Sequence, residues 1–161
     1  MVTGIVIPHE TTVALQKVEF QNLTDYQTAV GGYIETVHLE GHPLVIVADE
    51  DGKVKRLPVN RRATCLWWLL NPDGLGGDFL VGDIVILGAQ KRGDMTDVPN
   101  KLTELLLDAH EYQVQVCLSR QFNNWVPIGR TYKDFFEATI SALSLMEVWE
   151  PPKDVKVVAV D

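Results

Sequence analysis

The apolar stretches of this sequence are short, and this feature limits the folds open to the chain more than any other. The longest of them, Cys65–Leu70, has six residues, whereas a membrane-spanning helix needs about 20. Most of the others are rich in Val and Ile and end at Gly, Pro or Asp, which is typical of short strands. The pattern therefore predicts a protein without a membrane span, built from short strands and short helices.

Several segments have the composition, or the alternation of apolar and polar residues, that predicts a β-strand. The segment Asp83–Gly88 is apolar enough to predict burial on both faces. A hairpin turn is predicted over Asp49–Lys53, with Asp51 and Gly52 in the left-handed conformation and the chain returning through Val54 and Leu57. The predicted strands are residues 5–7, 13–20, 33–39, 44–48, 83–88, 112–118 and 155–160.

Capping residues predict two helices in the first half of the chain. Asn22 or Thr24 begins a short helix that ends at Gly31, because glycine readily takes the left-handed conformation of a helix end. Asn60 caps a second helix that runs to Leu70, before Asn71 and Pro72. The residues predicted to face the core from this second helix are Ala63, Leu66, Trp67 and Leu70.

Two further helices are predicted in the second half. Asp97 caps the first, with Pro99 in its first turn, and Thr131 with Asp134 resembles a capping box for the second. The second helix continues to Met146 and is apolar nearly all round, so it is either enclosed within the fold or part of a homodimer interface. The residues predicted to form that interface are Phe135, Phe136, Ile140 and Leu143.

This succession of elements predicts an α+β fold, with a mixed or mostly antiparallel sheet packed by two to four helices. The polar stretch Gln90–Thr96 is the predicted domain boundary. Residues 1–93 are expected to form an α+β domain, and residues 94–161 a helix-strand-helix-strand extension packed on it.

The charge balance argues against a general nucleic-acid-binding protein. The chain has 14 Lys and Arg against 22 Asp and Glu, a net charge of -8, whereas phosphate-binding surfaces need clustered cations. An acidic mimic of DNA is an alternative, but the longest acidic run is only Asp49–Asp51. Solubility is the default meaning of such a charge.

Neither the pattern of the cysteines nor the N-terminus of the sequence indicates secretion. Cys65 and Cys117 both lie in apolar patterns and are predicted to be buried thiols in a reducing compartment. The N-terminus lacks a basic region and reaches Pro8 too early for a signal peptide. The predicted location is therefore the cytoplasm, or the cytoplasm of a host.

Two motifs with a superficial chemical signature are not favoured as sites. His38 and His42, with Glu40 between them, have the spacing of helical metal ligands, but they lie where a strand runs into a loop. The glycine-rich loop Asp73–Asp78 has no Lys, is flanked by carboxylates and follows a helix instead of opening one, so it is a poor phosphate cradle. His9 and His110 have no supporting neighbours in the sequence. No metal, cofactor or catalytic residue is predicted.

The two residues after the cap of the second helix are more informative. Arg61 and Arg62 place two cations at the positive end of the helix dipole, where Asp or Glu would be more favourable. They could receive an anion there, either a nucleotide phosphate or a carboxylate of a partner. The alternative is an ion pair with the acidic segment Asp49–Asp51. Two aromatic residues complete the predicted binding set: Trp68, which is either an exposed anchor or covered by the C-terminal segment, and Tyr33.

Four motifs follow one another in the first ninety residues: residues 26–35, 51–53, 57–64 and 81–88. In this order they resemble the family called domain of unknown function 3846, which occurs mostly in bacteriophages, prophages and plasmids. The resemblance implies an accessory protein of a phage or mobile element, and it carries no catalytic residue to transfer.

Three functions follow as expectations. The first is a non-enzymatic accessory protein that binds a host protein, in host takeover or counter-defence. The second is a binder that sequesters a small anionic ligand such as a nucleotide signal. The third, least favoured, is a hydrolase whose site the sequence does not reveal.

Overall fold

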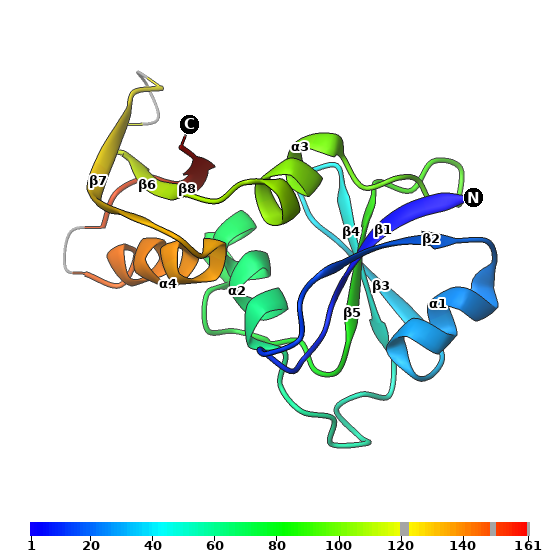
Figure 1. Ribbon diagram of the computed structural model, residues 1–161. Coiled ribbons are helices and arrows are strands. Elements are labelled where there is room, and N and C mark those ends of the chain that lie inside the picture. Colours follow the sequence, from blue (N-terminus) through cyan, green and yellow to red (C-terminus); the bar gives the residue numbers. More distant parts are fainter. Residues whose placement is uncertain (120–122, 149–150, 161) are drawn as a thin grey trace. The chain divides into compact units, whose positions relative to one another are not determined.

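The computed structural model describes residues 1–119, 123–148 and 151–160, and the chain divides into two compact units (Figure 1). The first unit contains Met1–Thr64 and Gly77–Thr103, and the second contains Cys65–Gly76 and Glu104–Asp161. Both are built on antiparallel sheets, which confirms the predicted α+β class. The division into domains at residue 93 stays a prediction.

A five-stranded sheet forms the first unit. Its order is β2-β1-β5-β4-β3, and every neighbouring pair is antiparallel. All five strands lie close to predicted segments, although β2 begins at Gln16 and not at Val13. The strands are β1 (Val2–Ile7), β2 (Gln16–Phe20), β3 (Ile34–His38), β4 (Leu44–Asp49) and β5 (Ile84–Gly88).

Helix α1 (Leu23–Val30) packs on one face of this sheet, against β3, β4 and β5. Asn22 is its N-cap and accepts a hydrogen bond from the Asp25 backbone N–H, while Gly31 ends it with φ of 86°. The ring of Tyr26, a residue of α1, stacks on the ring of Phe20 at the end of β2, with centroids 4.6 Å apart. Each of the five residues of β5 is buried, which confirms the prediction of a strand buried on both faces.

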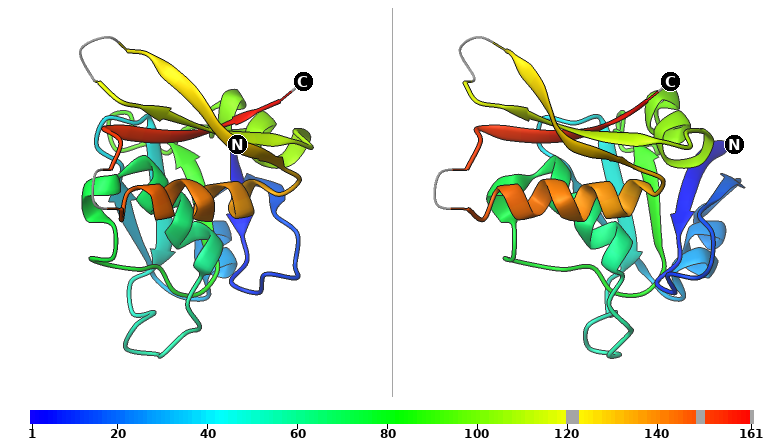
Figure 2. Two further views of the ribbon diagram at one scale, coloured as in Figure 1. Left: turned by 90° about the vertical axis from the view of Figure 1, so that its left-hand side faces the viewer. Right: turned by 60° about the vertical axis from the view of Figure 1, so that its left-hand side comes forward.

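A three-stranded sheet forms the second unit, in the order β7-β6-β8. Helix α4 (Phe135–Leu145) runs along one face of it and contacts all three strands (Figure 2). The strands are β6 (Tyr112–Cys117), β7 (Trp125–Tyr132) and β8 (Asp154–Ala159). Asn123, just before β7, has φ of 44°, and residues 120–122 lie outside the described part of the chain.

Helix α2 (Arg61–Leu70) begins in the first unit and continues into the second, where the short 3-10 helix η1 (Pro72–Gly74) follows it. Ala63 and Leu66 are buried as predicted, whereas Trp67 and Leu70 are only partly buried and Leu69 is buried instead. Helix α3 (Asn100–Thr103) ends the first unit, and a π-helical turn (η2, Glu104–Asp108) opens the long second segment of the other.

The predicted hairpin at Asp51 and Gly52 is wrong. Residues 50–56 form consecutive turns and not a returning strand, and the left-handed residue there is Arg56, with φ of 60°. Gly52 is needed for a different reason: a Cβ atom at this position would lie 2.8 Å from Cγ2 of Val81. The glycine is therefore required by close packing and not by a hairpin turn.

Two predicted caps are also wrong. The Asp97 carboxylate accepts a hydrogen bond from the Thr3 backbone N–H at 2.8 Å, so it joins a strand and does not cap a helix. Thr131 donates its hydroxyl hydrogen to Glu111, and Asp134 alone caps α4 by accepting from the Glu137 N–H at 3.0 Å. In each case a more distant partner takes the side chain that local sequence had assigned to a helix end.

Candidate functional site

The start of α2 is held by a single buried amide. Asn60 has no exposed surface; its Nδ2 donates to the carbonyl oxygens of Ile7 at 2.7 Å and Gly82 at 2.9 Å. Its Oδ1 accepts from the Ala63 N–H at 3.0 Å, which is the predicted N-cap. Every polar atom of this side chain is thereby used, and the end of β1 and the segment before β5 are tied to the first turn of α2.

Arg62 holds the loop that follows β1. One of its nitrogens, Nη2, donates to three carbonyl oxygens: those of Pro8 and Glu10 at 2.9 Å each, and that of Val13 at 2.7 Å. Charge-assisted bonds of this kind shape a loop that has no regular structure of its own. The structure thus gives Arg62 a positioning role for residues 8–13.

Arg61 differs from Arg62 in its surroundings. It is exposed, and within the described residues no ion pair or hydrogen bond involves its guanidinium. It lines a pocket of about 380 Å³, here called the Arg61 pocket, at the first turn of α2. The other lining residues are His9, Glu10, Thr11, Thr12, Pro58 and Val59.

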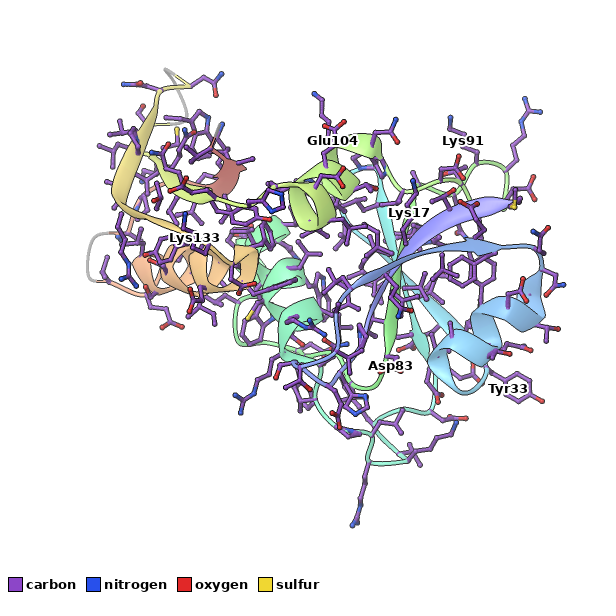
Figure 3. The ribbon with its side chains drawn as sticks, in the orientation of Figure 1. Lys17, Tyr33, Asp83, Lys91, Glu104 and Lys133 are labelled. Carbon is purple, nitrogen blue, oxygen red and sulfur yellow. The ribbon has the colours of Figure 1, made fainter. Side chains whose placement is uncertain are left out.

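A histidine with a fixed orientation forms another part of this pocket. Nδ1 of His9 lies 2.8 Å from Oδ1 of Asp83, and the His9 backbone N–H donates to the same oxygen at 3.0 Å. The His9 side chain is 30% exposed, so a ligand can reach it. Asp83, labelled in Figure 3, directly precedes β5. Sequence reasoning missed this pair because the two residues are 74 positions apart.

One signal could have found the pair. His9 lies just after β1, Asp83 lies just before β5, and these strands are antiparallel neighbours in which Ile7 pairs with Ile84. In such a pair the end of one strand adjoins the start of the other. A sequence-based pairing of the two apolar strands would have placed the imidazole beside the carboxylate.

A second pocket lies at the end of β4 and has a volume of about 180 Å³. We call it the acidic pocket, because Glu35, Asp49 and Glu50 line it together with Lys53 and Phe79. Lys53 forms an ion pair with Asp78 and lies 4.8 Å above the Phe79 ring. The remaining lining residues are Ala48, Val54, Leu80 and Val81.

The buried carboxylate of the acidic pocket has its counter-ion within the chain. Asp49 is 4% exposed; its Oδ2 accepts from Nζ of Lys55 at 2.7 Å and its Oδ1 from the Asp51 N–H at 2.9 Å. Burial by itself would raise the pKa of Asp49, but the bonds from Lys55 and Asp51 outweigh it and hold the pKa below its usual value. The carboxylate correspondingly raises the pKa of Lys55.

The structure does not bring the two predicted aromatic residues together with the arginines as one site. Tyr33 is 69% exposed and its carbonyl accepts from the Glu50 N–H at 2.9 Å, near the acidic pocket. Trp68 is partly buried and belongs to the portion of α2 in the second unit. Neither lines the Arg61 pocket.

The other sequence candidates are also placed. His38 ends β3 and His42 lies in the following loop, and the described residues contain no group of three or more side chains suited to a metal ion. The glycine-rich loop includes η1, and Asp78 at its end pairs with Lys53. Of the proposed dimer residues, Phe135, Phe136 and Leu143 are buried and Ile140 is 59% exposed.

Comparison with known families places the chain. A family model described as Domain of unknown function (DUF3846) matches residues 2–111. The chain belongs to the DUF3846 family. The match extends past the first ninety residues and includes all residues of the Arg61 pocket and Asp83 of this DUF3846 protein. Searches of curated proteins and of solved structures each found no match to it. Among the described residues, none of the helices combines the length and the apolar character that a bilayer crossing requires.

Proposed function

We propose that this DUF3846 protein acts by binding, and that the Arg61 pocket takes a small anionic ligand of the phosphate or nucleotide kind. One observation carries the proposal: an exposed guanidinium without an ion pair in the described part of the chain shares a pocket with hydroxyl groups and an oriented imidazole. Arginine pairs with phosphate and carboxylate through several N–H groups at once.

The electrostatics of the chain favour a small anion over a nucleic acid. With a net charge of -8, the protein repels a long polyanion, whose binding depends on neutralising many phosphates. A small ligand needs only the local field of Arg61 and of the first turn of α2. The side chains of Thr11 and Thr12 add hydroxyl donors and acceptors at the same pocket.

In biological terms, binding without turnover fits an accessory protein that sequesters a nucleotide signal, in the counter-defence of a phage or another mobile element. The Arg61 pocket leads us to favour this small-ligand function over binding of a host protein, which the sequence alone favours.

Calorimetric titration with adenosine monophosphate, at low ionic strength, tests the proposal. Arg61→Ala is expected to weaken binding by about tenfold or more, as for a lost charge-assisted hydrogen bond. Lys91→Ala is the matched control, because Lys91 is an exposed cation near the opposite end of β5 from Asp83 (Figure 3). Equal affinities for wild type and Arg61→Ala, or no binding by wild type, would overturn the proposal.

A host protein partner is a second candidate, and the acidic pocket favours it. Exposed apolar side chains adjoin its carboxylates: Val54 is 84% exposed and Phe79 43%. A basic and apolar segment of a partner would complement this surface. Affinity purification of the wild type and of Phe79→Ser separates the two candidate functions. The substitution should abolish capture of a host protein and leave nucleotide binding intact.

A further inference from the structure

We propose that the ligand carries hydroxyl groups as well as its anion, as a nucleotide or a sugar phosphate does, and that Nε2 of His9 accepts a hydrogen bond from one of those hydroxyls. This inference rests on the proposed function and names the ligand class more closely. It follows from the state of the His9 ring and from the mixture of donors and acceptors around the Arg61 pocket.

The partner of His9 determines which ring nitrogen carries the hydrogen. An ionised carboxylate only accepts hydrogen bonds, and Oδ1 of Asp83 lies 2.8 Å from Nδ1 of His9. Nδ1 must therefore be the protonated nitrogen. In the neutral ring Nε2 then bears a lone pair and accepts a hydrogen bond.

Three further contacts hold this acceptor in place before any ligand arrives. The His9 backbone N–H is bonded to the same Asp83 oxygen at 3.0 Å. The carbonyls on either side of His9, those of Pro8 and Glu10, are both bonded to Arg62 at 2.9 Å. A group fixed in this way loses little conformational freedom on binding, so its hydrogen bond contributes more to affinity.

The pocket offers donors and acceptors of unlike kinds. Arg61 only donates, whereas the Glu10 carboxylate offers acceptors, as Nε2 of His9 does in the neutral form of the ring. Inorganic phosphate would satisfy Arg61 but would meet the Glu10 carboxylate as a like charge. A phosphate ester with free hydroxyls satisfies both kinds of group at once, and a volume of about 380 Å³ lies within the range of small-molecule sites.

The experiment compares three probes by calorimetry: adenosine monophosphate, its 2′,3′-dideoxy analogue and inorganic phosphate. We expect the ribose hydroxyls to strengthen binding about 3- to 10-fold over the dideoxy analogue, as for one neutral hydrogen bond. His9→Ala should remove that difference, so that adenosine monophosphate and its dideoxy analogue bind the variant with equal affinity. Thermal unfolding of each variant verifies that the fold is retained.

The protonation of the His9 ring can also be observed directly in the wild type. Long-range ¹H–¹⁵N correlation spectra of the wild type should show His9 protonated at Nδ1 and not at Nε2, with His9→Asn used for assignment. Asp83 is a positioning residue in this scheme. Asp83→Ala leaves Nδ1 without its acceptor, so it should release the tautomer and reduce adenosine monophosphate binding to the level of the dideoxy analogue.

The outcomes separate the two proposals. Equal affinities for the ribose and dideoxy probes, or an Nε2-protonated His9, would overturn the inference while anion binding at Arg61 stands. If none of the three probes binds, the proposed function itself fails. A hydroxyl-dependent gain that disappears in His9→Ala supports both.

Discussion

The two pockets of the first unit differ in how their principal charge is balanced. In the acidic pocket the Asp49 carboxylate is buried and bonded to Lys55 and to a backbone N–H. In the Arg61 pocket the guanidinium is exposed and takes part in no ion pair within the described residues. A charge whose partner lies within the chain stabilises the fold, and one without such a partner can serve a ligand. Variants should therefore affect stability at one pocket and binding at the other.

The largest expected effect is at Asn60, which ties the first turn of α2 to the end of β1 and to the segment before β5. Asn60→Ala removes two donated bonds and one accepted bond from a fully buried position. We expect a loss of about 3 kcal/mol in the free energy of unfolding, because several buried backbone groups lose their partners. Urea denaturation measures it. A loss under about 1 kcal/mol would show that water replaces the amide and that the side chain does not hold these segments together.

The next effect is at Asp49 and depends on pH. Asp49→Asn should cost about 2 kcal/mol at pH 7, because it removes a charge-assisted bond from a buried site. The pKa of Asp49 is lowered in the folded state, so its contribution is present above the unfolded pKa and is lost as pH falls through the folded value. As the pH falls below about 4, the free energy of unfolding should therefore decrease less for Asp49→Asn than for the wild type.

The neighbouring carboxylate provides the control for that measurement. Glu50 is exposed, and Glu50→Gln should change stability by less than about 0.5 kcal/mol. If Glu50→Gln and Asp49→Asn reduce the loss of stability at acid pH equally, the effect is one of net charge and not of the bond to Lys55.

A smaller effect is expected at Arg62. Arg62→Ala should cost about 1–2 kcal/mol, because three carbonyl oxygens lose a charged donor at a partly exposed site. It should also increase amide hydrogen exchange at residues 9–13, since the loop is no longer held. Unchanged exchange there would contradict its positioning role.

The smallest effect on stability is expected at Arg61. Arg61→Ala should leave the free energy of unfolding within about 0.5 kcal/mol, because no bond in the described part of the chain is lost. The same variant is the one expected to lose anion binding. If Arg61→Ala both destabilises the protein and abolishes anion binding, the expected difference between the two pockets is wrong.

Local sequence was enough to predict most of the fold. The caps at Asn60 and at Asn22, the latter with Thr24 as an alternative, and the end of α1 at Gly31 are predictable because each acts on backbone groups within a few residues. Asp97 and Gly52 were misassigned because their roles depend on Thr3 and Val81, which approach them only in the folded chain. The pair of arginines was recognised as a candidate, but their separate roles were not.

What the sequence determined by itself is the set of short strands and capped helices, together with the cationic start of α2. What only the tertiary structure decided is the site around it. The pairing of β1 with β5 brings His9 to Asp83, and the loop bonded to Arg62 brings Thr11 and Thr12 to the pocket that Arg61 lines. The physical reason is that strand pairing and loop closure join residues far apart in the chain, whereas periodicity and capping report only on neighbours.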